Sequence, residues 1–254
     1  MRIRVIPSLL LHKGGLVKSI KFKDHIYVGD PINAVKIFNE KEVDEIVVID
    51  IDASREKRPP NFSKIADIAS EAFMPMAYGG GITSIEEIKA ILFSGVEKII
   101  INKAAHTNTK LITEAARLFG NQSVMVSIDA KKFFLGGYKV YTDNGKTKTK
   151  YRPEIFAKLM EEAGAGEILL NNIENDGTYY GYDTALIREV ATAVSIPVVA
   201  IGGAGSVEDL AMAKQSGASA VAAGSMFVFQ RPHQAVLISY PSQEELRTKL
   251  FNRL

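Results

Sequence analysis

The sequence contains no cysteine, and no apolar run in it is long enough to cross a bilayer. Without cysteine, disulfides, thiolate nucleophiles and cysteine-based zinc sites are excluded. The sequence has four scattered histidines, which are His12, His25, His106 and His233. Their spacing is not that of metal ligands, so we predict neither a metal nor another cofactor. The first residues have a strand pattern where a secretory signal would have a basic and then an apolar region, so we expect a cytoplasmic protein without membrane contact.

The sequence also has little excess of charge of either sign, and its 254 residues carry a net charge of only +2. So small a charge gives no indication of nucleic-acid binding and suits an enzyme for small anions. With 46% hydrophobic residues the chain can bury a large core. Its length is typical of either one α/β barrel or two ordinary domains.

Short β-branched runs alternate along the chain with amphipathic helical patterns. Eight strands are predicted, at 3–9, 45–51, 75–78, 98–101, 123–128, 167–170, 197–201 and 220–223. Helices are predicted between them, among others at 31–39, 84–93, 109–119, 153–163, 184–193 and 207–215. Continuous apolar strands indicate a buried parallel sheet, and eight β/α units predict a TIM barrel over residues 1–254. An open doubly wound sheet is the alternative.

Three motifs of the first half recur in the second, each about 120 residues further on, which indicates a duplication. Gly79-Gly80-Gly81-Ile82 corresponds to Gly202-Gly203-Ala204-Gly205, Asp44-Glu45-Ile46-Val47 corresponds to Gly166-Glu167-Ile168-Leu169, and Ser8-Leu9-Leu10 corresponds to Ser127-Ile128-Asp129. We therefore predict two half-barrels, at about 1–120 and 121–254.

Each half has small residues after its third and fourth strands, where backbone amides can approach an anion. The first set is Gly80, Gly81, Asn102 and Lys103, and the second is Gly202, Gly203, Gly224 and Ser225. Tight βα turns are the structural alternative. Because the sets are duplicated, we expect an elongated ligand with a phosphate or similar anion at each end.

The two halves differ at the end of their first strands. Ser127-Ile128-Asp129 ends in a carboxylate, whereas the corresponding Ser8-Leu9-Leu10 ends in an isobutyl group. A pair of acids would favour acid/base chemistry between the two anion sites. Only one of the two is present.

A set of motifs spread over nearly the whole chain resembles a known family. They are Gly29-Asp30-Pro31, Asp50-Ile51-Asp52-Ala53-Ser54, Gly79-Gly80-Gly81-Ile82, Ser127-Ile128-Asp129-Ala130-Lys131, Asp176-Gly177-Thr178, Gly181-Tyr182-Asp183 and Gly202-Gly203-Ala204-Gly205. The chain is similar to the cyclase subunits of imidazole glycerol phosphate synthase, TIM barrels of histidine biosynthesis that receive ammonia from a glutaminase.

The resemblance assigns roles residue by residue. It implies a catalytic acid/base pair at Asp129 and at position 10, where this chain has leucine. Lys18, Asp50, Asp176 and Gly177 match the family, which adds Lys18 and Asp176 to the predicted catalytic residues and Gly177 to the predicted phosphate-binding ones. Two further positions have changed, since the family's serine is Ile201 and its threonine is Lys103. These changes suggest a different ligand.

The resemblance also implies an ammonia gate at the opposite end of the barrel. Four charged residues stand at the starts of predicted strands, and their charges sum to zero: Arg4, Glu45, Lys98 and Glu167. In the family, a ring of two basic and two acidic side chains closes the barrel at the face where the glutaminase docks. A salt-bridged plug that only stabilises the barrel floor is the alternative.

Two long βα connections are predicted at the catalytic face. Residues 11–29 carry several lysines and resemble an active-site lid for anions. Residues 137–151 alternate around Asp143-Asn144-Gly145, which predicts a hairpin that either encloses the ligand or projects into solvent. A final helix is predicted from Ser242.

Three functions remain open, in this order of preference. The first is a cyclase paralogue that delivers glutamine-derived ammonia for an amidino group on a surface-polysaccharide sugar, with a separate amidotransferase. The second is a true imidazole glycerol phosphate synthase cyclase of the lyase type that uses Asp129 without a second strand-end acid. The third is a non-catalytic subunit that docks and activates the glutaminase. The first two imply a phosphorylated small-molecule ligand.

Overall fold

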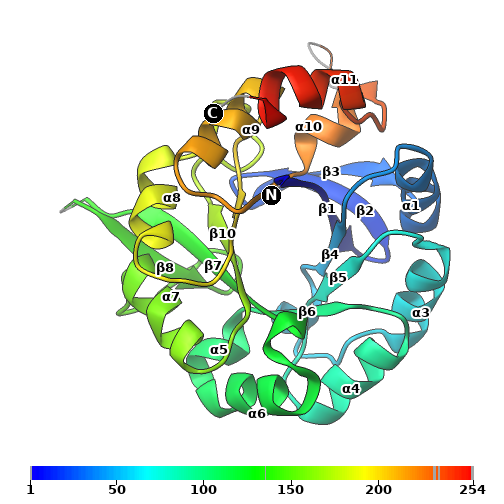
Figure 1. Cartoon of the computed structure of the whole chain (residues 1–254). Helices are drawn as coiled ribbons and strands as arrows, with labels where there is room; N and C mark the ends of the chain where they lie inside the picture. The colour runs from blue at the N-terminus through cyan, green and yellow to red at the C-terminus, as the bar shows by residue number, and fades with distance from the viewer. Residues whose placement is uncertain (1, 135, 231–232, 234, 253–254) are drawn as a thin grey trace.

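The computed structural model of the chain describes residues 2–134, 136–230, 233 and 235–252. The predicted domain limits at residues 1 and 254 lie outside this range. Eight strands of the main sheet form a closed circuit in which neighbours are parallel, as Figure 1 shows in a view along the barrel.

The strands of the barrel follow one another around it in chain order. They are β1 (Arg4–His12), β4 (Ile46–Asp50), β5 (Met76–Gly79), β6 (Lys98–Ile101), β7 (Val124–Lys132), β10 (Glu167–Asn172), β11 (Val198–Ile201) and β12 (Ala220–Ala223). Parallel pairing of β7 with β10 and of β12 with β1 closes the sheet. The predicted TIM barrel is therefore confirmed, and the open doubly wound alternative is wrong.

Helices cover the outside of the barrel between successive strands (Figure 1). The longer ones are α1 (Pro31–Glu40), α3 (Phe62–Glu71), α4 (Ile85–Phe93), α6 (Thr109–Phe119), α7 (Pro153–Glu162), α8 (Thr184–Ala191) and α9 (Val207–Gln215). Shorter ones are α2 (Ala53–Glu56), α5 (Lys103–Thr107), α10 (Ser225–Val228) and the 3-10 turn Asn121–Ser123. No helix in the described ranges is long and apolar enough to span a bilayer.

The helices α4 and α9 begin in the same way, at corresponding places in the two halves. Ser84 and Ser206 each accept a hydrogen bond from the backbone three residues on, and Glu87 and Asp209 complete the two capping boxes. The correspondence agrees with the motif repeat, although the duplication itself stays a prediction.

Two apolar cores result from the alternation of side chains along the strands. The larger core lies between the strands and the helices and includes Val5, Phe38 and Phe156. The smaller core fills the inside of the barrel and includes Ile6, Met125 and Leu169. Residues one position apart on a strand thus belong to different cores.

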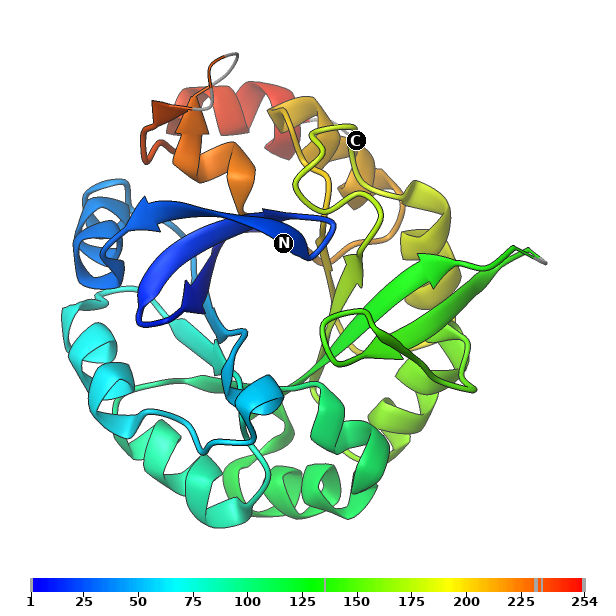
Figure 2. The ribbon, with the colours of Figure 1, turned by 180° about the vertical axis from the view of Figure 1, so that it is seen from behind.

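Two hairpins extend the barrel at its carboxyl end, and Figure 2 shows both at the end facing the viewer. The first consists of β2 (Gly15–Ile20) and β3 (Lys23–Gly29), where β2 continues the sheet from β1. The second consists of the end of β7, β8 (Tyr138–Thr142) and β9 (Thr147–Lys148). The predicted hairpin is confirmed. The predicted lysine-rich loop also forms a hairpin, and the register of its two strands shifts at two places.

The segment after β12 is attached to the barrel at β1. After the strands β13 (Phe229–Gln230) and β14 (Ala235–Val236), the Tyr240 hydroxyl donates to the Val5 carbonyl over 3.0 Å. The final helix is α11 (Gln243–Leu246), capped by Ser242 as predicted and continued by a π-helical turn over Arg247–Phe251.

The turn after β5 requires glycine at position 80. Gly80 has a φ of +124°, and a Cβ at this position would overlap the Asp50 carbonyl oxygen. Gly14 also has a positive φ, of +82°, but no atom outside its chain neighbours would lie within 4 Å of its Cβ. A side chain would therefore strain the backbone at both positions, whereas it would overlap a neighbouring atom only at Gly80.

We expect Gly80→Ala to lower the free energy of unfolding by about 3 kcal/mol or more, and Gly14→Ala by about 1 kcal/mol. Urea denaturation of both variants measures this difference. Equal losses would show that the overlap at Gly80 relaxes without cost.

Candidate active site

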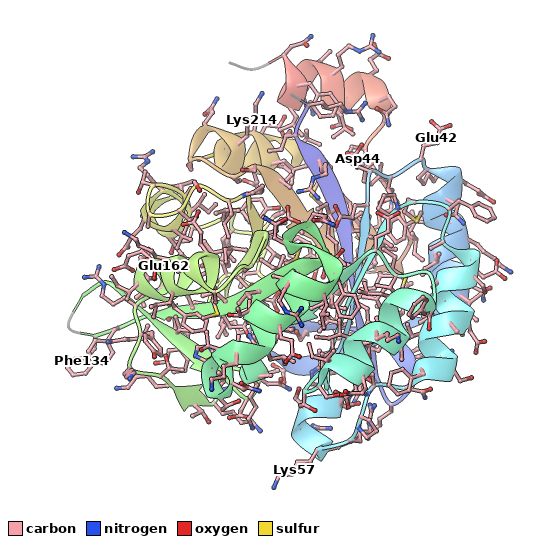
Figure 3. The ribbon with its side chains drawn as sticks, turned by 60° about the horizontal axis from the view of Figure 1, so that its bottom comes forward. Glu42, Asp44, Lys57, Phe134, Glu162 and Lys214 are labelled. Atoms are coloured by element: carbon pink, nitrogen blue, oxygen red, sulfur yellow. The ribbon has the colours of Figure 1, made fainter. Side chains whose placement is uncertain are left out.

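A cavity of about 790 Å³ opens at the carboxyl ends of the barrel strands. This is the end at which active sites of TIM barrels lie. Lys57, which lies at the rim of this cavity, and Asp44 are at opposite ends of the barrel in Figure 3. The cavity reaches down to Ile49, Ile100 and Leu169, which belong to or pack on the inner apolar core.

Asp129 lies on β7 and lines this cavity. Its carboxylate accepts a hydrogen bond from the Asn102 amide over 3.1 Å. Burial and, to a smaller extent, the neighbouring Asp176 carboxylate raise the pKa of Asp129 to about 7, against the lowering effects of the Asn102 hydrogen bond and of Lys131. A carboxyl group with this pKa can both accept and release a proton near neutral pH.

Asp176 and Lys18 lie together on the opposite side of the cavity from the first glycine set. The Ser19 hydroxyl donates to the Asp176 carboxylate over 3.2 Å, and the Lys21 amide donates to the Asp176 carbonyl over 2.9 Å. Burial raises the pKa of Asp176 and lowers that of Lys18 to about 8. The three predicted catalytic residues Asp129, Asp176 and Lys18 thus share one cavity.

Leu10 and Ile201 also line the cavity, where the family resemblance implies an acid and a serine. Leu10 pairs with Ile49 of the neighbouring strand β4, so the side of the cavity opposite to polar Asp129 is apolar. A leucine side chain has no proton to exchange, and this position cannot serve as the second acid/base group.

The first predicted phosphate-binding set lines the cavity as a group, with Gly80, Gly81, Asn102 and Lys103 all at its surface. The Gly81 amide donates to the Ser54 hydroxyl over 3.3 Å. The Lys103 amino group forms an ion pair with Asp143 at 2.6 Å. Lys103 therefore connects the end of β6 to the second hairpin.

The second predicted set is arranged differently, and here the structure corrects the sequence. Gly202 and Gly203 do not line the cavity, because residues 171–181 cover them. The Gly181 amide donates to the Gly203 carbonyl over 2.9 Å, and a Cβ on Gly202 would lie 2.6 Å from the Asn171 amide oxygen. These glycines make room for packing, as the turn alternative supposed.

Gly177, Gly224 and Ser225 lie beside the first hairpin. Gly177 and Ser225 line a separate pocket of about 10 Å³, and Gly224 and Ser225 also reach the large cavity. A Cβ on Gly224 would overlap the amino group of Lys18. Lys18 is only 6% exposed and donates to the Ser8 carbonyl, so this lysine of the predicted lid points into the barrel.

Both hairpins enclose the mouth of the cavity. The Asn144 amide, at the turn of the second hairpin, donates to the Ile51 carbonyl over 3.2 Å across the mouth. On the first hairpin, His25 stacks on His12, with 4.8 Å between the ring centroids, and His12 contacts Asp52 over 2.9 Å. The second hairpin is therefore part of the enclosure and does not only project into solvent.

The four predicted gate residues meet at the opposite end of the barrel. Arg4 forms ion pairs with Glu45 and Glu167, and Lys98 contacts the same two carboxylates over 3.1 and 2.8 Å. Each cation thus bridges both acids in a closed ring, which we call the charge ring. The glutamates are buried, whereas the side chains of Arg4 and Lys98 are 30% and 20% exposed.

The sequence analysis did not identify some of the residues that line the cavity. The Ser8 hydroxyl and the Asn171 amide oxygen are buried and have no hydrogen-bond partner among the described residues. Arg58 binds both oxygens of Asp50, over 3.0 and 2.8 Å. Position along the strand could have indicated Ser8 and Asn171, because each lies two residues beyond an inward-facing apolar residue.

A closed eight-stranded α/β barrel whose polar groups gather at the carboxyl ends of the strands defines the TIM-barrel class. Residues 4–232 match the family model described as "Histidine biosynthesis protein". The chain belongs to this family, and within it to the group like the cyclase subunits of imidazole glycerol phosphate synthase.

Three relatives illustrate the similarity. The "Putative imidazole glycerol phosphate synthase subunit hisF2" of Pseudomonas aeruginosa is 53% identical, over 97% of this chain and 98% of its own. A protein of Leptospira interrogans with a similar name is 48% identical, over 96% and 97%. The "Imidazole glycerol phosphate synthase subunit HisF" of Alkaliphilus metalliredigens is 41% identical, over 88% and 89%.

We expect Asp129 to make stability depend on pH. Because its pKa is raised from 3.8 to about 7 by folding, the folded chain binds more protons than the unfolded chain between these values, and stability falls as pH rises through this window. Asp129→Asn removes this titration. Between pH 5 and pH 8 it should gain on the order of 1–3 kcal/mol relative to the original chain, measured by urea unfolding. Parallel pH profiles would contradict the shift.

Proposed function

We propose that this protein receives ammonia from a glutaminase partner and passes it through the barrel to an acceptor bound in the large cavity. The observation that carries the proposal is the intact charge ring on the axis of a barrel whose other end is an enclosed polar cavity.

The route follows the inward face of the strands. Inside the charge ring lies an apolar layer that includes Ile6, Val47, Ile100 and Leu169, each two residues along its strand from a ring residue. An apolar passage favours neutral ammonia over ammonium, since a charged group loses its hydration there.

Beyond this layer the unpartnered acceptors Ser8 Oγ and Asn171 Oδ1 line or adjoin the cavity floor. They lie two residues further along β1 and β10 than Ile6 and Leu169. Ammonia is a hydrogen-bond donor, so these two oxygens are suited to receive it where the apolar passage ends. We assign them the role of positioning residues for the incoming nitrogen.

The glutaminase is proposed to dock at the amino-terminal face, over the charge ring. Opening the ring requires its two cations to separate from buried carboxylates, which is unfavourable unless another charge compensates them. A partner that supplies such charges would couple docking to opening. This arrangement favours a gate over a plug, because the partly exposed side chains of Arg4 and Lys98 are accessible from that face.

Asp129 is proposed as the acid/base group of the cavity, since its pKa of about 7 allows proton transfer in both directions. Lys18 and Asp176 line the same cavity. With Leu10 at the first strand end, a reaction that needs two strand-end acids loses one of them, and a positioned acid contributes about a hundredfold to ten-thousandfold in rate.

The acceptor is therefore proposed to differ from that of histidine biosynthesis. We favour a paralogue that supplies ammonia for an amidino group on a surface-polysaccharide sugar, together with a separate amidotransferase. Leu10 and Ile201 support a different acceptor because they make one wall of the cavity apolar.

A true cyclase is the second candidate. It is favoured by the shared cavity of Asp129, Asp176 and Lys18, and by the similarity to a relative named as a synthase subunit. A subunit that only docks and activates the glutaminase is less well supported, because it needs no enclosed cavity of this size.

Replacing Leu10 with aspartate separates the two candidates. With ammonium and the ribulosyl-formimino substrate of the cyclase, we expect negligible turnover by the original chain and at least about a hundredfold more by Leu10→Asp. Leu10→Asn controls for polarity without a proton-transfer group. Robust turnover by the original chain would refute the paralogue proposal and establish the true cyclase.

The charge ring is tested in the complex with the glutaminase. The test uses the original chain or Leu10→Asp, whichever turns over the ribulosyl-formimino substrate. Lys98→Met should lower glutamine-dependent turnover at least about tenfold and leave ammonium-dependent turnover within about threefold, because free ammonia can enter by the cavity mouth. Lys110→Met, on the outer helix α6, is the control. An equal loss of glutamine-dependent and ammonium-dependent turnover would show that the ring is only a structural plug.

A further inference from the structure

We propose that Asp143 and Asn144 are specificity-determining residues, because they fasten a turn across the mouth of the large cavity and so limit the size of the molecules that reach Asp129. The turn and β9 together, residues 143–148, are called the strap. The inference rests on the proposed function for one point, that the acceptor binds in this cavity. An acceptor larger than ammonia then enters only when the strap opens.

The strap crosses the mouth from the side of β7 to that of β4. β8 pairs with the end of β7, and the turn after β8 places the Asn144 amide against the Ile51 carbonyl, just after β4. β5 and β6 lie between β4 and β7 in the barrel, so the turn spans the ends of both strands. Asp143, Asn144 and Lys146 all line the cavity. In Figure 2 the turn of the second hairpin reaches over the mouth towards α2.

One side of the strap is supported by the barrel. Tyr138, Val140 and Thr142 of β8 are all buried. The Lys131 amino group, on β7, donates to the Gly145 carbonyl over 2.6 Å and so holds the backbone of the turn. β8 is therefore a fixed support from which the strap extends.

The other side of the strap is held by two polar contacts. The Asp143 carboxylate pairs with the Lys103 amino group at 2.6 Å, and the Asn144 amide donates to the Ile51 carbonyl over 3.2 Å. The side chains of Lys103 and Asp143 are 44% and 33% exposed, so water screens their attraction. Both residues of β9 are exposed as well. A segment with so few buried contacts opens more readily than the barrel that supports it.

The backbone of the turn allows the two contacts to be broken without changing its shape. Asp143 and Asn144 have φ values of +53° and +54°, a left-handed conformation that aspartate and asparagine both tolerate. Asp143→Asn combined with Asn144→Asp, called the exchange variant, therefore keeps the turn, the composition and the net charge. It removes the charge that pairs with Lys103, and a carboxylate at position 144 cannot donate to the Ile51 carbonyl.

Access to the cavity can be measured with a single thiol, because the sequence contains no cysteine. Ser127 lines the cavity two residues before Asp129 on β7, and Ser127→Cys introduces a thiol there with little change in size. N-ethylmaleimide is the small reagent, and fluorescein-5-maleimide is the bulky one. Ser70→Cys, on the exposed surface of α3, gives the intrinsic ratio of their rates.

We expect the bulky reagent to react with Ser127→Cys at least about tenfold more slowly than the intrinsic ratio implies, because only the open fraction of the protein admits it. The exchange variant should raise this rate at least about fivefold and leave the rate of the small reagent within about twofold. Raising the salt concentration tenfold should also accelerate the bulky reagent. Asp143→Asn should abolish this dependence on salt, because salt acts by screening the ion pair.

Two controls accompany the exchange variant. Asp24→Asn on the first hairpin is the matched substitution, since Asp24 also has a left-handed backbone, with a φ of +50°. It should change neither rate more than about twofold, because Asp24 takes no part in fastening the strap. Hydrogen exchange should become faster at the amides of residues 143–148 in the exchange variant and stay unchanged in the barrel strands, which shows that the barrel is folded.

The proposal fails if the two reagents react with Ser127→Cys in the intrinsic ratio, or if the exchange variant leaves the rate of the bulky reagent unchanged. It also fails if neither reagent reacts with Ser127→Cys in any variant, because the strap would then not be what limits access. The assay involves neither a glutaminase nor turnover. A failed test of the charge ring would therefore leave the strap standing, and a failed test of the strap would leave the ammonia route standing.

Discussion

The alternation of side chains along the parallel strands is the constraint from which the rest of this structure follows. On β1 the inward residues are Arg4, Ile6, Ser8 and Leu10, and they belong in turn to the charge ring, the apolar layer, the cavity floor and the cavity wall. On β10 the inward series Glu167, Leu169 and Asn171 repeats this order. Because closure of the sheet fixes the register of all strands, each function occupies one level of the barrel.

The same alternation explains how much the sequence could predict. The barrel followed from eight apolar runs and their spacing, and the charge ring followed from charges at strand starts, where burial demands a partner. Strand ends were less well predicted, since β1 and β7 continue as far as His12 and Lys132 into their hairpins. Hydrogen bonding to a neighbouring strand decides where a strand ends, and a local pattern does not contain this information.

The candidate site shows the same limit at single residues. Glycine at a strand end is equally suited to anion binding and to close packing, and only the position of neighbours distinguishes the two. At Gly81 the neighbouring space is part of the cavity. At Gly202 it is filled by Asn171, and at Gly224 by Lys18. Of the corresponding pairs in the duplicated motif, Gly80 and Gly203 share a positive φ, whereas Gly79 and Gly202 do not. The use of each glycine depends on side chains from distant loops.

The packing of Lys18 against Gly224 has a consequence for how this chain can change over time. A side chain at 224 would displace the end of the Lys18 side chain, and a shorter residue at 18 would leave Asp176 without its cation. Substitutions at these three positions are therefore mutually dependent, although more than 150 residues separate the first from the last. We expect the three to covary among relatives in which the second half of the barrel has kept or lost room for a ligand.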